Sequence, residues 1–332
     1  MLKFFNNKSI LITGATGSFG KNFVNYLLNY SKSKKIIIFS RDEYKQFKLK
    51  QLYQNHKNFK KLRFFIGDIR DLKRLEIAFS GVDFVIHAAA LKHVDIAEYN
   101  PIEFINTNII GTQNVILASI SQKVRKVIVL STDKAVNPIN LYGSTKLSSD
   151  KLAIAANNYA LKKNTIFSVV RYGNVVNSRG SVIPKFLELT NLNKKTLPVT
   201  DVRMTRFVIS IKDAIEFVIQ SLSIMKGAEI FLPKCKTIKI IDLVSSFNKK
   251  PIFIGKRPGE KLHESLISED DSSDLYEFKN FYIQKLNEKN SPKKIKLGTL
   301  LGEKIKNFNY SSNDKAFLKI NKIKILINDL LR

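Results

Sequence analysis

Short apolar runs alternate with helix-like patterns along the first half of the chain. The apolar runs show no polar alternation, which is typical of strands buried on both faces. These runs cover residues 8–13, 35–40, 64–67, 84–88, 127–131 and 167–171. Between them, apolar positions recur at helical spacing at 72–79, 101–119 and 142–160. Buried strands separated by helices indicate an α/β fold with a doubly wound parallel sheet.

The alternation weakens after Asn174. Residues 177–205 contain glycine and proline at several positions, and we expect this stretch to be irregular. A helix at 211–223 and a strand at 229–232 resume the pattern. From residue 235 the chain is rich in lysine and reads as scattered short elements.

The chain length of 332 residues favours one large domain or two closely joined domains. We predict that residues 1–175 with 206–234 form the sheet domain. Residues 176–205 with 235–332 are predicted to form a smaller C-terminal domain that completes the site.

The net charge of +28 raises the question of a nucleic-acid surface. The lysines are spread along the whole chain, however, as solvated surface residues are. Examples are Lys8, Lys60, Lys126, Lys194, Lys249 and Lys322. We therefore expect no nucleic-acid partner, although the positive charge would help to attract an anionic nucleotide substrate.

Other features of the composition exclude several protein classes. No apolar run approaches the roughly 18 residues that a membrane span needs, so we expect a cytoplasmic protein without membrane contact. The single cysteine, Cys235, excludes an internal disulfide and a cysteine-cluster metal site, and we predict no metal.

A glycine-rich turn follows the first predicted strand and opens a helix. In the sequence TGATGSFG of residues 13–20, Gly14 permits a tight turn, Gly17 lets the backbone approach a pyrophosphate, and Gly20 lets the helix pack closely. The helix N-terminus adds amide donors and partial positive charge. We predict a dinucleotide site of Rossmann type, in which the contacts here are Gly14, Thr16, Gly17, Ser18, Phe19 and Gly20.

The tip of the second strand bears on which nicotinamide dinucleotide is bound. An acidic residue there, such as Asp42, would hold the ribose 2′-hydroxyl of NAD, whereas an arginine would pair with the 2′-phosphate of NADP. Arg41, with Ser40 and Lys45 nearby, favours NADP.

Five later residues belong to the predicted cofactor site. Asp68 and Ile69 follow the third strand, where adenine is held. Ala88 and Ala89 follow the fourth strand and would line the cofactor without bulk, and Lys92 would lie near the reacting atoms.

Thr132, Tyr142 and Lys146 carry the predicted oxidation chemistry. Tyr142 and Lys146 are four residues apart and share one helix face. The lysine can lower the tyrosine pKa and bind the nicotinamide ribose, so both residues are also predicted cofactor contacts. The phenolate can then take a proton from an alcohol while hydride leaves to the nicotinamide. Thr132, at the end of the fifth strand, would help to bind the reacting oxygen.

Asp133 and Lys134 add an acid and an amine that a plain dehydrogenase does not need. Once an alcohol is oxidised to a ketone, the neighbouring C–H is acidified. A neutral Lys134 could take that proton, and a protonated Asp133 could give one to a departing hydroxyl. The pair therefore predicts an elimination.

With these residues, the chain resembles the inverting UDP-N-acetylglucosamine 4,6-dehydratases, which begin pseudaminic acid synthesis for bacterial flagellin glycosylation. The matching stretches run in the same order along the chain. They are residues 13–20, 40–43, 64–72, 87–94, 97–101, 131–135, 140–146, 170–176, 203–207 and 257–264.

The resemblance implies a complete reaction. Tyr142 and NADP would oxidise C4 of the sugar, Lys134 would take the C5 proton, and Asp133 would assist loss of the C6 hydroxyl as water. Hydride would return to C6, and reprotonation of C5 from the opposite face would give UDP-2-acetamido-2,6-dideoxy-β-L-arabino-hexos-4-ulose. The NADP would be tightly bound and recycled. Membrane-anchored retaining relatives carry methionine where this chain has Tyr142.

The resemblance also implies a UDP-sugar site and a homo-oligomer, for which a hexamer is one candidate. The implied substrate contacts are Lys92, Asn174, Ser181, Val182, Lys185, Arg206, Arg257 and Glu260. Forked arginine donors suit a diphosphate.

Four residues depart from the family pattern near the substrate side. Asn177 stands in place of glycine, Asp95 in place of proline, and Lys185 and Val208 in place of aromatic residues. These departures leave open the exact sugar and the C5 stereochemistry. The alternatives are a 4,6-dehydratase without inversion, a 4-epimerase and, from another class, a non-catalytic nucleic-acid-binding protein.

Overall fold

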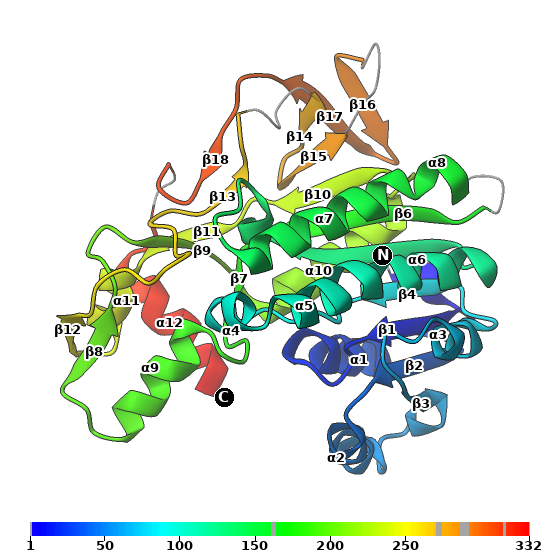
Figure 1. Cartoon of the computed structure of the whole chain (residues 1–332), viewed down its shortest axis with the longest axis horizontal. Coiled ribbons are helices and arrows are strands. Elements are labelled where there is room, and N and C mark those ends of the chain that lie inside the picture. Colours follow the sequence, from blue (N-terminus) through cyan, green and yellow to red (C-terminus); the bar gives the residue numbers. More distant parts are fainter. Residues whose placement is uncertain (1, 161–163, 270–273, 286–291, 315–316, 332) are drawn as a thin grey trace.

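The computed structural model describes residues 2–160, 164–269, 274–285, 292–314 and 317–331. Its main feature is a sheet of eleven strands in the order β16-β17-β14-β15-β10-β6-β5-β4-β1-β2-β3 (Figure 1). Seven of them, from β3 to β10, are parallel to one another. Their bounds are β1 Ser9–Thr13, β2 Lys35–Ser40, β3 Leu62–Ile66, β4 Phe84–His87, β5 Lys126–Thr132, β6 Ile166–Tyr172 and β10 Glu229–Pro233.

The predicted doubly wound parallel sheet is therefore confirmed. Each predicted apolar run forms a strand, and β1, β4 and β10 are buried along their whole length. Because side chains on both faces of these strands leave water, a continuous apolar run satisfies them where an alternating run would not.

Helices cover the sheet. Helices α3, α6 and α7 pack side by side in front of the strands in Figure 1, and α1 packs against α10. The bounds are α1 Ser18–Tyr30, α2 Glu43–Tyr53, α3 Leu72–Phe79, α4 Val94–Tyr99, α5 Pro101–Phe104, α6 Gly111–Ser121, α7 Leu141–Ala155, α8 Asn157–Ala160 and α10 Ile211–Ile224. Short helical turns complete the set: η1 Leu2–Phe5, η2 Phe59–Lys61, the π-helical η3 Ile105–Ile110, and η4 Asp133–Ala135.

A smaller lobe lies at the left of Figure 1 and has its own apolar core. It contains β7 Asn174–Val175, α9 Val182–Asn191, β8 Thr196–Val199, β9 Thr205–Ile209, β11 Lys236–Lys239, α11 Ile240–Ser246, β12 Lys250–Phe253 and α12 Ile320–Leu331. Its core includes Ile183, Phe186, Leu197, Leu243 and Ile323.

The expectation that residues 177–205 are irregular is wrong, because α9 and β8 form there. Pro184 lies in the first turn of α9, where a missing backbone N–H costs no helical hydrogen bond. Pro198 lies in a sheet of only two strands, β8 and β12, where proline is tolerated.

Four strands between residues 275 and 305 extend the main sheet. Strand β15 pairs antiparallel with β10, and three further strands follow it outward. These strands are β14 Leu275–Glu277, β15 Phe281–Lys285, β16 Lys294–Leu297 and β17 Leu300–Ile305, while β13 Ser265–Ile267 pairs with β18 Tyr310–Ser311. The two predicted domains thus share a sheet, and their division stays a prediction.

Candidate active site

The glycine-rich turn joins β1 to α1 in close contact with the loop after β4. Gly14 has a φ of +64°, and a Cβ placed there would lie 2.8 Å from the Cα of Ala89. A Cβ on Gly20 would lie 2.5 Å from the Cα of Ala15, so both glycines are required. No side chain caps α1, whose N-cap residue is Gly17. Its first N–H groups are therefore oriented to bind phosphate oxygens.

The rest of this turn is arranged around the same point. Thr16 and Ser18 are partly buried, and the Ser18 hydroxyl accepts a hydrogen bond of 3.0 Å from the backbone N–H of Arg179. The ring of Phe19 stacks on that of Tyr172, with centroids 6.4 Å apart. The turn fits a dinucleotide pyrophosphate.

At the tip of β2, the acidic and basic residues have different tasks. Asp42 caps α2 by accepting a hydrogen bond of 2.9 Å from the backbone N–H of Lys45, and its carboxylate also pairs with the Lys45 ammonium. Arg41 is exposed, and its guanidinium lies 3.8 Å from the Asp68 carboxylate. Ser40 is buried and receives a bond from Gln46. A cation is therefore available at this tip, whereas the acid is engaged by α2.

Apolar residues after β3 and β4 line the predicted cofactor site. Ile69 is buried, and a Cβ on Gly111 would lie 2.6 Å from its Cδ1. The backbone N–H groups of Ala88 and Ala89 are held by the Thr13 hydroxyl at 3.2 and 3.3 Å.

The Lys134 ammonium lies among three acceptors at the junction of β5 and η4. Its Nζ is 3.0 Å from Asp133 Oδ1, 3.2 Å from Glu264 Oε1 and 3.4 Å from Asn174 Oδ1. The Thr132 hydroxyl also donates to Asp133 Oδ1, at 2.9 Å. Asp133 is fully buried, and its Oδ2 has no partner among the described residues.

This arrangement determines the charge states in the site. Burial acts to lower the pKa of Lys134, but the anionic Asp133 and Glu264 outweigh it and raise the pKa above its usual value. Burial raises the pKa of Tyr142 to about 12, and the positive charge of Lys134 opposes that rise. Without a bound cofactor and substrate, Lys134 is therefore an ammonium and Tyr142 a neutral phenol near neutral pH.

Helix α7 brings Tyr142 and Lys146 to this cluster. Asn140 caps the helix by accepting a hydrogen bond of 2.8 Å from the Gly143 N–H. The buried Lys146 ammonium donates to the Leu130 carbonyl of β5 at 2.8 Å. Burial lowers the pKa of Lys146, and the anionic Asp150 opposes the change.

Replacing Gly143 with alanine is expected to separate α7 from η4. The new Cβ would overlap the Lys134 carbonyl oxygen, a backbone atom that cannot rotate away. We expect a loss of stability of about 1–3 kcal/mol, typical of overpacking, together with a strong loss of turnover. Urea unfolding and activity assays of Gly143→Ala measure both effects. Ser144→Ala, at the adjacent exposed position, should resemble the parent, and equal effects of the two changes would contradict this prediction.

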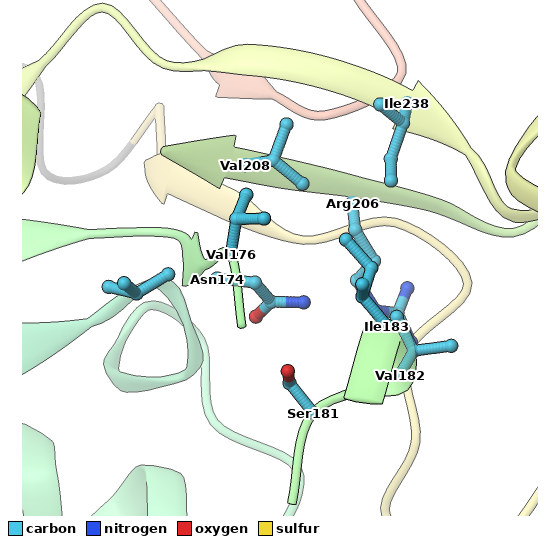
Figure 2. Close-up of a pocket in the computed structure, with 9 residues that line it drawn as sticks. Asn174, Val176, Ser181, Val182, Ile183, Arg206, Val208 and Ile238 are labelled. Carbon is cyan, nitrogen blue, oxygen red and sulfur yellow. The ribbon is translucent and has the colours of Figure 1, made fainter. Parts of the chain in front are cut away.

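Four of the predicted substrate residues line one pocket. Asn174, Ser181, Val182 and Arg206 surround it with apolar residues of β9 and β11. Figure 2 shows the Asn174 amide and the Ser181 hydroxyl turned toward the same hollow. The Ser181 hydroxyl is buried and has no partner among the described residues, so it is available to a ligand.

The other predicted substrate residues lie at different distances from this pocket. Arg206 is buried and pairs with Glu260 at 3.5 Å. Arg257 is about half exposed and pairs with Asp95 at 3.7 Å. Lys185 is exposed on α9 and does not line the pocket, and Lys92 is exposed after β4. The ligand roles of these residues stay predictions.

Glu264 and Arg179 belong to this region but were not predicted individually. Glu264 is buried and contacts Lys134, and the backbone of Arg179 contacts the phosphate turn. Glu264 ends a stretch that matches the resembled family, and this was the available signal for it. No sequence pattern marks Arg179 as a neighbour of Ser18.

The sequence matches a known protein family. Residues 10–286 match the family described as polysaccharide biosynthesis protein. The chain belongs to this family. The matched range contains the phosphate turn, the Lys134 cluster and the lined pocket, and it ends one residue after β15.

Relatives within and around the polysaccharide biosynthesis family differ in their named activities. The chain is 53% identical to a Campylobacter jejuni protein named UDP-N-acetylglucosamine 4,6-dehydratase (inverting), over 93% of this chain and 94% of that one. It is 44% identical to a Rickettsia bellii protein named UDP-glucose 4-epimerase, over 84% of this chain and 83% of the relative.

Solved structures share the fold. The X-ray structure of Pen from Bacillus thuringiensis has a TM-score of 0.89 at 37% identity and covers 99% of both chains. Solved structures at 20–23% identity with the same fold, which include dTDP-glucose 4,6-dehydratases, were determined with NAD bound.

The described residues contain neither a helix that could span a membrane nor a side-chain cluster that could hold a metal ion. None of the helices in the described ranges has both the length and the apolar character that a membrane crossing needs. Within the same residues, no group of three or more His, Cys, Asp or Glu side chains is placed to hold a metal ion.

Proposed function

We propose that this protein is a UDP-N-acetylglucosamine 4,6-dehydratase that inverts C5. Its product would be UDP-2-acetamido-2,6-dideoxy-β-L-arabino-hexos-4-ulose. The observation that carries the proposal is the contact of 3.0 Å between Asp133 and Lys134 beside Tyr142, because it adds an acid–base pair to an oxidation site. The name of the C. jejuni relative at 53% identity supports the same substrate and the same inversion.

Oxidation at C4 requires a base for the sugar hydroxyl. When bound, the nicotinamide accepts a hydride from C4 and later returns it to C6. Tyr142 would take the proton of the C4 hydroxyl, with Thr132 binding the same oxygen. Burial raises the phenol pKa to about 12, and the positive charge of an oxidised nicotinamide would act together with that of Lys134 to lower it.

Elimination then requires one proton to leave C5 and another to reach the C6 oxygen. Transfer of a proton from Lys134 to Asp133 across their 3.0 Å contact produces an amine and a carboxylic acid together. Lys134 would take the C5 proton, and Asp133 would protonate the departing hydroxyl. Water leaves, and both residues regain their starting charges.

The lined pocket would bind part of the UDP-sugar. Arg206 can donate to a diphosphate, and the unpartnered Ser181 hydroxyl and the Asn174 amide can bond to polar groups of the substrate. Arg257, Glu260, Lys185 and Lys92 are proposed to contribute at the rim.

We propose NADP as the cofactor, tightly bound and recycled, because the exposed Arg41, which makes a long ion pair of 3.8 Å with Asp68, could approach a 2′-phosphate while Asp42 caps α2. Arg41→Ala is expected to weaken NADP binding by about 10- to 100-fold, since a charge-assisted hydrogen bond contributes roughly 1.5–3 kcal/mol. NAD affinity should stay unchanged. Titration of cofactor-stripped protein with each dinucleotide measures both constants, and an equal loss for NAD and NADP would contradict the assignment.

A 4-epimerase is the second candidate, because the Rickettsia bellii relative at 44% identity carries that name. An epimerase needs no proton removal at C5 and no acid for C6. The Asp133–Lys134 pair therefore favours the dehydratase. Release of water from the sugar distinguishes the two reactions.

Three further predictions accompany this function. We propose that the protein works in the cytoplasm, that it forms a homo-oligomer, and that its product enters pseudaminic acid synthesis for flagellin glycosylation. The positive net charge of the chain would also attract the anionic UDP-sugar.

The deciding experiment incubates the protein with UDP-N-acetylglucosamine in heavy water and follows the sugar by proton NMR. We expect a 6-methyl 4-keto sugar with deuterium at C5 and L-arabino geometry. Retained geometry at C5 would keep the dehydratase but remove the inversion. An unchanged carbon skeleton with only C4 inverted would identify the epimerase.

A further inference from the structure

Lys134 is held by two buried carboxylates, and the proposed reaction uses only one of them. Asp133 follows β5, whereas Glu264 comes from a distant part of the chain, immediately before β13. The side chain of Glu264 is 3% exposed, and its Oε1 lies 3.2 Å from Lys134 Nζ. Its second oxygen, Oε2, is buried without a partner among the described residues.

The backbone around Glu264 is fixed at both of its polar groups. The Glu264 N–H donates to the Ser312 hydroxyl at 3.0 Å, and the Ser312 N–H donates to the Glu264 carbonyl at 2.7 Å. The Ser312 hydroxyl also lies 2.7 Å from that of Thr205 on β9. Three separate chain segments therefore hold the Glu264 carboxylate against Lys134.

Burying the Glu264 carboxylate costs free energy unless the anion is paired with a cation. The Lys134 ammonium donates hydrogen bonds to Asp133 and Asn174 and forms an ion pair with Glu264. If Lys134 passes a proton to Asp133, the Asp133 carboxyl becomes neutral, and Glu264 is the remaining anion beside the amine. Glu264 is thus placed to stabilise the ammonium that re-forms when Lys134 takes a proton from carbon.

Three cations and one neutral phenol also lie near the Lys134 ammonium. Arg206 on β9 and Lys261 lie close enough for their positive charges to oppose it, as does Lys92 after β4. Tyr142 on α7 is neutral in the absence of ligands. With three cations nearby, the loss of either carboxylate would leave an excess of positive charge around Lys134.

We propose that Glu264 is a positioning residue that keeps one shared proton on the Asp133–Lys134 pair and orients the Lys134 amine toward C5. This inference rests on the proposed dehydratase function. As a consequence, the Asp133–Lys134 pair keeps its shared proton at high pH. A lysine surrounded by positive charges alone would lose its proton there.

The step to which Glu264 contributes is balanced in atoms and charge. The C5–H bond breaks, its proton forms a new N–H bond on Lys134, and its electron pair forms the C5–C6 double bond. The C6–O bond breaks, and the oxygen takes the Asp133 proton and leaves as water. Lys134 ends as an ammonium between two carboxylates, with Glu264 unchanged throughout.

The test is the pH dependence of kcat/KM for Glu264→Gln, measured by water elimination from UDP-N-acetylglucosamine. Loss of a neighbouring anion lowers a lysine pKa by roughly one to three units. We therefore expect the alkaline fall in activity to move to lower pH by about that amount. Glu264→Asp keeps an anion at a greater distance, and its alkaline fall should lie between those of the parent and Glu264→Gln.

A structural role for Glu264 would give a different result. Glu229→Gln removes another buried glutamate, one that bonds to Ser168 far along the chain from the cluster, and provides the matched control. The control should lower the unfolding midpoint without moving the alkaline fall. An unmoved alkaline fall in Glu264→Gln, or in Glu264→Asp if the glutamine variant does not fold, overturns the inference. Absence of elimination by the parent protein would instead reject the proposed function.

Discussion

Lys134→Ala is expected to stop water elimination while C4 oxidation continues. The variant retains Tyr142 and Lys146, which serve the oxidation, but it has no base for the C5 proton. General-base catalysis contributes roughly 10²- to 10⁴-fold, and we expect a fall in turnover of that size. Because no C5–C6 alkene forms, hydride could return only to C4, and reduced nicotinamide should persist on the protein at the level set by the C4 oxidation equilibrium. Its near-ultraviolet absorbance after addition of UDP-N-acetylglucosamine provides the measurement.

Tyr142→Phe is the matched comparison for this prediction. It removes the base for the C4 hydroxyl, so neither oxidation nor elimination should proceed, and no reduced nicotinamide should form. Both variants should retain bound cofactor, because neither change touches the glycine turn. If Lys134→Ala still incorporates deuterium at C5 at the parent rate, Lys134 is not the base that removes the C5 proton.

The sheet and the cofactor turn could be predicted because their signals are local. A strand such as β1 is an apolar run of five residues, and the turn after it is set by glycines whose absent side chains make room for Ala89 and Ala15. Tyr142 and Lys146 could be paired for the same reason, since helical spacing alone places them on one face.

The second carboxylate at Lys134 could not be predicted in this way. Glu264 and Lys134 are 130 positions apart, and they meet only because Ser312 and Thr205 fix the backbone beside β13. The helix α9 was missed for another reason. Pro184 argues against a helix in general, but it is accepted in the first turn, and only the position of the helix start reveals this.

These two cases have a common cause. The predicted catalytic residues lie at the ends of parallel strands or on α7, which form from local patterns, whereas Glu264 comes from the C-terminal part of the chain. The same part continues the sheet through β15. The proton affinity of Lys134 therefore depends partly on a contact of high sequence separation.

Asp150→Ala is expected to cause the largest loss of stability among the changes considered. Asp150 on α7 pairs with Arg171 on β6 at 3.0 Å, and both side chains are almost fully buried. The Ser131 hydroxyl, next to Thr132 on β5, donates to the same carboxylate oxygen at 2.8 Å. Removing the acid leaves a buried guanidinium without its anion, which costs about 3–5 kcal/mol. Urea unfolding of the purified protein measures the change.

The double variant Asp150→Leu/Arg171→Met separates the cost of an unpaired charge from the loss of the pair itself. It removes both charges together and should be much more stable than Asp150→Ala, since apolar replacement of a buried pair is often neutral. Arg203→Ala breaks an exposed pair with Asp201 and should leave the unfolding midpoint almost unchanged. A single variant as stable as the parent would mean that water reaches Arg171. In that case the pair would not be what holds β5, β6 and α7 in register around Thr132, and the alignment of Tyr142 with Lys134 would depend on the Asn140 cap and the Gly143 contact alone.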